Sequence, residues 1–171
     1  MNEIILYADG ACRSNPGPGG YGVVLLADGQ RREFSGGFRK TTNNRMELFS
    51  VIRGLREVAP LNSLVTIYSD AQYVVNMYNG GYARQWRSNG WTRNKGKDPA
   101  LNPDLWGALL DLCALHQVRF VWVKGHSDNK ENARCDELAV SARQEKDLPI
   151  DAGYERTAAP EPPRQLELFG G

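Results

Sequence analysis

The chain has 171 residues, enough for one compact domain and a short extension but not for a second full domain. Hydrophobic residues make up 41% of the chain and charged residues 24%, which excludes a collagen-like, coiled-coil or wholly disordered protein. With 21 Lys and Arg against 20 Asp and Glu, the net charge is +1. A polyanionic ligand would therefore have to be bound by basic residues gathered locally.

Cysteine usage and hydropathy indicate a compartment. The three cysteines, Cys12, Cys113 and Cys135, are an odd number without C-x-x-C spacing, and the N-terminus resembles no secretory signal. Both observations favour a reducing environment. No apolar run approaches the roughly 18 residues needed to span a bilayer. We therefore expect a cytoplasmic protein that does not enter a membrane. We also expect a monomer.

Three β-rich stretches open the chain, over residues 4–11, 20–27 and 31–38. The segments between them, Asn15–Gly20 and Asp28-Gly29, are composed largely of turn-forming residues. The pattern predicts an antiparallel meander of three strands.

Helices and strands then alternate. Apolar residues at helical spacing predict a helix over residues 43–58, which Pro60 ends. Asn102 is the predicted cap of a helix that begins with Pro103. We expect the remaining strands over 64–69 and 118–123, and the helices over 70–78, 82–88, 103–115 and 132–146. This order predicts an α/β domain with one mixed sheet flanked by helices.

The composition changes after about Pro149. Residues 151–171 contain prolines at positions 160, 162 and 163 and few core-type side chains, which predicts a flexible tail. The tail holds four acids and two bases, so its charge of −2 leaves +3 on residues 1–150. We therefore expect one folded domain over residues 1–150 and a tail over residues 151–171.

Four acids occupy positions that suggest a site. Asp9 interrupts an apolar strand, where an unpaired carboxylate is costly, and Asp70 follows another strand at the edge where open α/β sheets bind ligands. Glu47 and Asp136 lie on predicted helices. Taken singly, Asp70 could be a helix cap and the two helical acids could be solvated.

Together, carboxylates that converge in one pocket repel one another unless divalent cations neutralise them. Oxygen-only ligands select Mg²⁺ or Mn²⁺. Two such ions about 3.5–4 Å apart activate a water and stabilise a leaving oxygen in phosphoryl displacement. The four acids therefore indicate nuclease chemistry.

Four separated motifs resemble type 1 ribonuclease H. They are Tyr7–Cys12, Thr41–Leu48, Ser69–Val74, and Trp122–His126 followed by Asn132–Asp136. The resemblance covers about residues 3–146 and implies a five-stranded mixed sheet. It also implies Mg²⁺-dependent endonucleolytic hydrolysis of the RNA strand of RNA–DNA hybrids, with 3′-hydroxyl and 5′-phosphate products, in primer and R-loop removal. By the same resemblance the metal ligands are Asp9, Glu47, Asp70 and Asp136.

His126 lies in a polar loop before the last acid, where a histidine is ordinarily a surface residue. The resemblance implies instead that His126 assists proton transfer or product release, a role that suits a group titrating near neutral pH. The sequence departs from the family where Ser127-Asp128-Asn129 replaces a loop that often carries glycine.

Distinguishing RNA from DNA requires contacts to the 2′-hydroxyl. The candidates flanking the acids are Cys12, Asn15, Asn43, Asn44 and Gln72. A turn role for Asn15 and a helix-start role for Asn43 stay open as alternatives. Weaker candidates, for phosphate contact, are Arg13, Thr42 and Arg45.

A basic segment with interleaved aromatics runs from Arg84 to Lys97. Such a segment suits a groove that follows phosphates, and in bacterial members of the family this region resembles a basic protrusion that holds the DNA strand. Here we expect a weaker, more salt-sensitive contact through Tyr82, Arg84 and Trp86. Inward packing of Trp86 against the domain is the alternative.

The tail ends in Gln165-Leu166-Glu167-Leu168-Phe169. The segment resembles the short peptide by which bacterial replication and repair proteins bind the sliding clamp, with Gln165, Leu166, Leu168 and Phe169 as contacts; an unstructured terminus is the alternative. For the whole chain, two other functions stay open. One is an integrase-like DNA nuclease of the same broad fold, and the other is a hybrid-binding module without catalysis.

Overall fold

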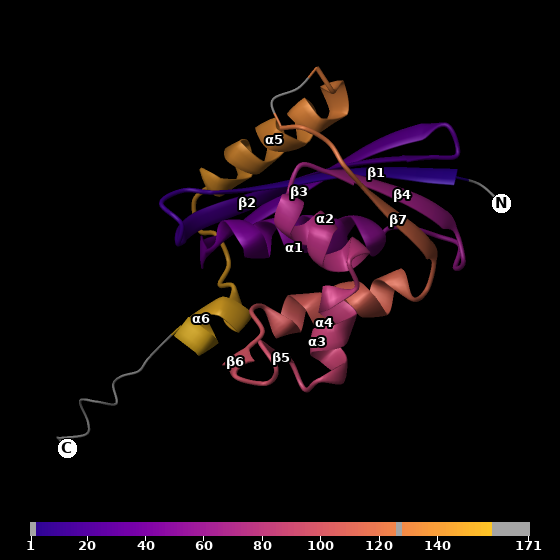
Figure 1. The fold of residues 1–171 in the computed structure, drawn as a ribbon. Coiled ribbons are helices and arrows are strands. Elements are labelled where there is room, and N and C mark those ends of the chain that lie inside the picture. Colours follow the sequence, from indigo (N-terminus) through magenta and orange to yellow (C-terminus); the bar gives the residue numbers. More distant parts are fainter. Residues whose placement is uncertain (1–2, 126–127, 159–171) are drawn as a thin grey trace.

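The computed structural model describes residues 3–125 and 128–158, and its centre is a five-stranded sheet (Figure 1). The strands are β1 (Glu3–Cys12), β2 (Gly17–Ala27), β3 (Gln30–Thr41), β4 (Leu64–Ser69) and β7 (Gln117–Trp122). In space they run in the order β3-β2-β1-β4-β7. β1, β2 and β3 form an antiparallel meander, while β4 pairs in parallel with both β1 and β7. The predicted mixed sheet is confirmed.

Helices cover both faces of the sheet (Figure 1). Along one face lie α1 (Asn43–Leu55), α2 (Gln72–Asn79), α3 (Tyr82–Ser88) and α4 (Pro103–Cys113). Across the other lies α5 (Lys130–Arg143). A small hairpin of β5 (Thr92–Arg93) and β6 (Asp98–Pro99) follows α3, and α6 (Ala152–Ala158) ends the described chain. Among the described helices none is both long and apolar enough to cross a membrane.

The hydrophobic core lies between the sheet and α1 and continues between α1 and α4. On β1 the even-numbered Ile4, Leu6 and Ala8 are buried toward α1, as the period of two along a strand requires. In α4 the fully buried Trp106 donates its Nε1 hydrogen to the Tyr73 hydroxyl at 2.9 Å. These contacts pack α1 against the central strand and join α4 to α2.

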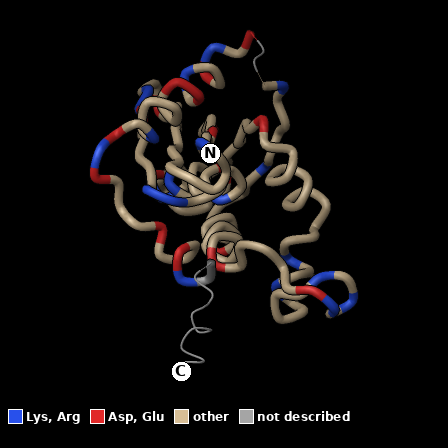
Figure 2. Tube along the Cα trace, turned by 90° about the vertical axis from the view of Figure 1, so that its left-hand side faces the viewer, with Lys and Arg blue, Asp and Glu red and all other residues tan. Residues whose placement is uncertain are grey.

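Ion pairs fasten α5 to the meander. Glu131 accepts two hydrogen bonds from Arg31, at 2.7 and 3.0 Å, and Glu33 accepts two from Arg134, at 2.9 and 3.0 Å. Figure 2 shows basic and acidic positions interspersed around the molecule. The small net charge therefore comes from many opposite charges placed close together.

Asn102 is the N-cap residue of α4, as predicted, and its carbonyl oxygen accepts the Trp106 amide at 3.0 Å. Asn102 has a left-handed backbone, with φ of 57°, and its side chain does not cap α4. Instead its Oδ1 accepts a hydrogen bond from Arg45 Nη1 at 3.3 Å. Thr42 caps α1, because its Oγ1 accepts the Arg45 amide at 3.2 Å. The start of α1 and the start of α4 are thus tied together.

The predicted tail begins too early. Asp151 is buried, and α6 follows it. The Asp151 carboxylate accepts hydrogen bonds from Arg45 Nε at 2.7 Å and Nη2 at 3.0 Å, and from the Thr41 hydroxyl at 2.7 Å. Glu155 of α6 accepts two from Arg39, at 2.8 and 2.9 Å. These polar contacts hold a segment that has few apolar side chains, which is why composition alone misplaced the boundary.

Candidate active site

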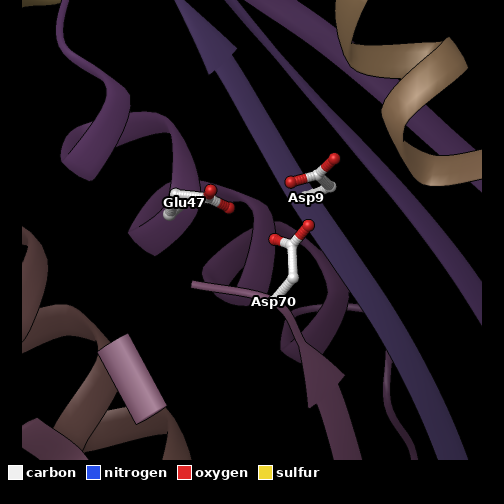
Figure 3. Close-up of side chains that lie close together, drawn as sticks. All are labelled: Asp9, Glu47 and Asp70. Atoms are coloured by element: carbon white, nitrogen blue, oxygen red, sulfur yellow. The ribbon is translucent and has the colours of Figure 1, made fainter. Parts of the chain in front are cut away.

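Three of the predicted acids meet at the end of the sheet (Figure 3). Asp9 lies on β1, Glu47 on α1, and Asp70 directly follows β4. One carboxylate oxygen from each lies within 4.8 Å of those of the other two. The pairing of β1 with β4 ends at Tyr7 and Tyr68, so β1 extends beyond its neighbour and leaves room for the acids.

Two glycines let the helices approach the strands that carry or flank the site. A Cβ on Gly10 would lie 2.6 Å from the Glu47 backbone nitrogen, and a Cβ on Gly22 would lie 2.3 Å from the Cys135 carbonyl oxygen. Gly22 is the partner of Asp9 across the β1–β2 pair. The absence of these side chains therefore brings α1 and α5 directly against the strands beside Asp9.

Backbone hydrogen bonds orient the acids. The Gly10 amide donates both to Asp9 Oδ1, at 2.9 Å, and to Glu47 Oε1, at 2.8 Å. The Trp122 indole donates to the main-chain oxygen of Asp70 at 3.1 Å, which fixes the chain where it leaves β4. The Asp9 and Glu47 carboxylates are thus oriented by hydrogen bonds, whereas for Asp70 it is the main chain that is fixed.

The surroundings of the cluster disfavour negative charge on its carboxyl groups. Asp9 is only 4% exposed, and burial together with the charges of Asp70 and Asp136 raises the pKa of Asp9 from 3.8 to about 8. Burial and the charges of Asp9 and Asp70 raise the pKa of Glu47 well above its ordinary value. A cation bound beside these two carboxylates would stabilise their charged forms.

Asp136 completes the predicted set of acids. It lies on α5 and lines a pocket of about 580 Å³ together with Asp9, Glu47 and Asp70. It is outside the group of three that lie within 4.8 Å, but its charge and a side-chain hydrogen bond contribute to the raised pKa of Asp9. All four predicted acids therefore face one pocket.

The donor set fits divalent cations. It consists of carboxylate oxygens from several elements, it contains no thiolate or imidazole among the described residues, and it is desolvated and self-repelling. Hard cations such as Mg²⁺ prefer oxygen ligands and relieve this repulsion. Asp9, Glu47 and Asp70 are the residues best placed to hold one.

Most of the predicted 2′-hydroxyl contacts surround the acids. Cys12, Asn43, Asn44 and Gln72 line the same pocket. Asn43 Oδ1 accepts the Cys12 amide at 2.8 Å, and Asn15 Oδ1 accepts the Asn43 amide at 3.0 Å. These bonds tie the turn between β1 and β2 to the start of α1, so both asparagines also have a structural role.

The three predicted contacts on α3 are not among the residues that line the pocket. Tyr82 is 51% exposed, whereas the Arg84 guanidinium lies 5.1 Å from the centre of the Tyr78 ring. The Trp86 ring packs edge-on against Trp106, with 6.2 Å between the ring centres. Trp86 thus adopts the inward packing that the sequence left open.

Arg45 does not suit a phosphate contact. It is 4% exposed, and its guanidinium is shared between Asp104 and Asp151, each at 2.7 Å. The prediction of a phosphate contact is therefore wrong. Nothing in the local sequence indicated its partners, which lie 59 and 106 residues away.

Several predicted residues fall outside the described ranges, namely His126 in the loop before α5 and Gln165, Leu166, Leu168 and Phe169 in the tail. Gly125, just before His126, lies against the site, since a Cβ there would be 2.9 Å from Asp70 Oδ2. Residues that sequence reasoning missed also line the pocket: Tyr73, Asn132, Ala133, Glu137 and Arg143. For Arg143 a signal existed, because it follows Asp136 by seven residues, two helical turns along the same face.

The sequence of the chain matches known proteins. Residues 1–144 match the family model for RNase H. The chain is 58% identical to a ribonuclease H of Trichodesmium erythraeum over 90% of this chain and 96% of that one, and 51% identical to a ribonuclease HI of Synechocystis over 90% and 95%.

Solved structures of ribonucleases H have a similar fold. LC9-RNase H1, described as a type 1 RNase H with the type 2 active-site motif, is 31% identical with a TM-score of 0.72 over 93% of this chain and 82% of that one. LC11-RNase H1 in complex with an RNA/DNA hybrid is 28% identical with a TM-score of 0.60 over 81% and 95%. A family match over most of the chain, joined to an acidic pocket where the motifs predicted it, leads to one conclusion. The chain belongs to the ribonuclease H family.

Proposed function

We propose that this protein is an endoribonuclease that hydrolyses the RNA strand of RNA–DNA hybrids, leaving 3′-hydroxyl and 5′-phosphate ends. The observation that carries the proposal is the convergence of Asp9, Glu47 and Asp70, whose oxygens lie within 4.8 Å of one another, in a chain of this family. The relative solved with an RNA/DNA hybrid supports the choice of substrate.

In this proposal the four acids together bind two Mg²⁺ ions, or two Mn²⁺ ions. Two ions bound there would activate a water and stabilise the leaving oxygen of an in-line displacement. Glu47 and Asp9 each accept the Gly10 amide through one oxygen, and this shared donor sets how the two carboxyl groups are oriented at the pocket. The fourth acid, Asp136, comes from α5, the helix on the opposite face of the sheet from α1 (Figure 1).

The residues around the acids select the hybrid. Asn43, Asn44 and Gln72 present amide groups at the pocket, and Cys12 and Asn15 hold Asn43 in place. Amide and backbone groups at this position suit the 2′-hydroxyls of an RNA strand in a wide minor groove. Tyr82 and Arg84, together with the bases of the β5–β6 hairpin, supply a second and weaker contact to the DNA strand.

His126 is proposed to move protons or to assist product release. The residue before it, Gly125, lies against the Asp70 carboxylate. An imidazole titrating near neutral pH suits this task. If so, His126→Ala lowers kcat, and the loss varies with pH in the range where an imidazole titrates.

A direct test offers one labelled duplex in RNA–DNA, RNA–RNA and DNA–DNA forms, with and without Mg²⁺, to the wild type and to Asp70→Asn. We expect cleavage of the hybrid alone, only with Mg²⁺, and lost in the variant. Equal cleavage of the DNA duplex would favour the integrase-like alternative. Binding of the hybrid without cleavage by the wild type would favour the non-catalytic module.

We further propose that residues 165–169 bind the sliding clamp and thereby direct the enzyme to RNA primers and R-loops. The sequence of the segment, with Gln165 followed by Leu166, Leu168 and Phe169, supports this. A tether of this kind raises the local concentration of the enzyme at replicating DNA. Deleting residues 165–169 should abolish clamp binding and leave hydrolysis of free hybrids unchanged; equal clamp affinity would contradict the proposal.

A further inference from the structure

A second recess opens beside the catalytic pocket, between the β1–β2 turn and the end of α5. It has a volume of about 390 Å³, and three arginines line it: Arg13, Arg39 and Arg143. Glu145 and Asp147, both exposed, also line it. The recess is thus the place where arginines from three separate elements come together.

Arg143 connects the recess to the catalytic pocket, because it lines both. A Cβ on Gly20 would lie 2.8 Å from the Arg143 backbone nitrogen, and Gly20 pairs with Ala11 across the β1–β2 ladder. Arg143 therefore lies over the Ala11–Cys12 end of the pocket, two helical turns beyond Asp136. A duplex seated on the acids would cover this end.

The three arginines differ in whether an acidic side chain already pairs with them. Arg39 is committed to Glu155 through two hydrogen bonds. For Arg13 and Arg143 there is no ion pair with any of the residues that the structure describes. The Nε atom of Arg143 is buried, and no acceptor for its hydrogen lies among the described residues. A buried donor left without an acceptor is costly, so this position favours an anionic ligand.

We propose that Arg143, assisted by Arg13, binds one backbone phosphate of the nucleic acid at the Cys12 end of the pocket. A guanidinium matches the geometry of a phosphate and donates two hydrogen bonds to it. The inference rests on the proposed function, since the ligand is the hybrid itself. It adds an anchor on α5 that is separate from the basic segment around α3.

The test measures hybrid binding in an Asp70→Asn background and hybrid hydrolysis in the otherwise wild-type chain, each over a range of salt concentrations. Arg143→Gln should weaken binding about tenfold and raise KM with little change in kcat. The slope of log affinity against log salt should fall by about 0.9, the value for one lost phosphate contact. Arg56→Gln, an exposed arginine at the far end of α1 from Asn43, is the matched control and should change neither.

A second measurement separates binding from a structural effect. Single methylphosphonate linkages, which remove one phosphate charge, are placed in turn along each strand. At one position the methylphosphonate should lower the affinity of the wild type but leave the affinity of Arg143→Gln unchanged. Arg143→Lys should restore part of the salt slope. An unchanged slope, or a loss of affinity without any linkage-specific coupling, would overturn the proposal.

The two proposals fail in different ways. If the wild type neither binds nor cleaves the hybrid, the proposed function is wrong. If the wild type cleaves the hybrid and Arg143→Gln behaves as Arg56→Gln does, only the phosphate anchor is wrong.

Discussion

At the scale of single residues, the acids are arranged for binding at a cost in stability. Asp9 is almost fully buried, and its pKa of about 8 means that folding disfavours its charged form. A carboxyl group whose pKa is raised on folding destabilises the protein increasingly as the pH rises from its unfolded pKa to its folded pKa. At neutral pH the cluster without cations is therefore a source of strain that cations would relieve.

Glu47→Gln tests this conflict between function and stability. The amide can still accept the Gly10 hydrogen bond but removes one charge, so hydrolysis should fall at least hundredfold while the cation-free protein becomes about 1 kcal/mol more stable. Thermal unfolding with EDTA, compared with hybrid cleavage in Mg²⁺, checks both effects. Asp111→Asn removes an exposed charge on α4 and should change neither by a comparable amount. A variant less stable than the wild type in EDTA would contradict this account.

Cation binding should stabilise the wild type by relieving the same repulsion between carboxylates. Because bound ions neutralise repelling carboxylates, Mg²⁺ should raise the unfolding temperature, and the gain should grow with Mg²⁺ concentration as expected for a ligand that binds only the folded state. Scanning calorimetry with and without Mg²⁺ measures it. In Glu47→Gln the gain should shrink, and an equal gain in both proteins would show that the ions bind elsewhere.

At the scale of elements, the site depends on how closely helices approach strands. Gly22 is an example, because a Cβ there would meet the Cys135 carbonyl of α5 at 2.3 Å. The contact sets the distance between α5, with Asp136, and β1, with Asp9. The catalytic geometry is therefore encoded partly in residues that have no side chain.

Gly22→Ala should push α5 away from the sheet. We expect a loss of about 1–3 kcal/mol in stability and a fall in activity of more than tenfold, although every acid is retained. Gly107→Ala in α4 is the control, since a Cβ there only touches Trp91 at 3.5 Å, and alanine should stabilise the helix slightly. Denaturant unfolding and hybrid cleavage measure the two effects. Full activity in Gly22→Ala would show that α5 tolerates the displacement.

Sequence patterns predicted the five strands of the main sheet, the helices α1 to α5 and most of the pocket, because alternation, helical spacing and turn residues are local. They did not predict the short β5–β6 hairpin or α6. The motifs around Asp9, Glu47, Asp70 and Asp136 indicated which side chains face one another. They could not reveal that Arg45 is enclosed by Asp104 and Asp151, since that depends on packing between distant segments. The same contact explains why the domain extends to α6 rather than ending near Pro149.

At the scale of the whole molecule, the Arg45 cluster joins α1, α4 and the segment before α6. Burial alone would raise the pKa of Asp151, but hydrogen bonds from Arg45 and Thr41 outweigh it and hold the pKa below its ordinary value of 3.8. A carboxyl group with a lowered folded pKa contributes stability at neutral pH that is lost as the pH falls below about the unfolded value.

Asp151→Asn should therefore destabilise the protein by about 2 kcal/mol at neutral pH. The difference from the wild type should persist down to about pH 4 and shrink below it, as Asp151 becomes protonated in the wild type. Urea unfolding at a series of pH values gives the curve. A difference that is constant down to pH 2 would show that the charge of Asp151 is not what stabilises α6.

The order of the acids along the chain has a consequence for synthesis. Asp9, Glu47 and Asp70 come from the first half of the protein, but Asp136 lies on α5, which packs on strands made more than a hundred residues earlier. A chain still emerging from the ribosome therefore holds three of the acids without the fourth and without the helix that supports β2. Nuclease activity is expected to be among the last properties that the growing protein acquires, after the domain is complete.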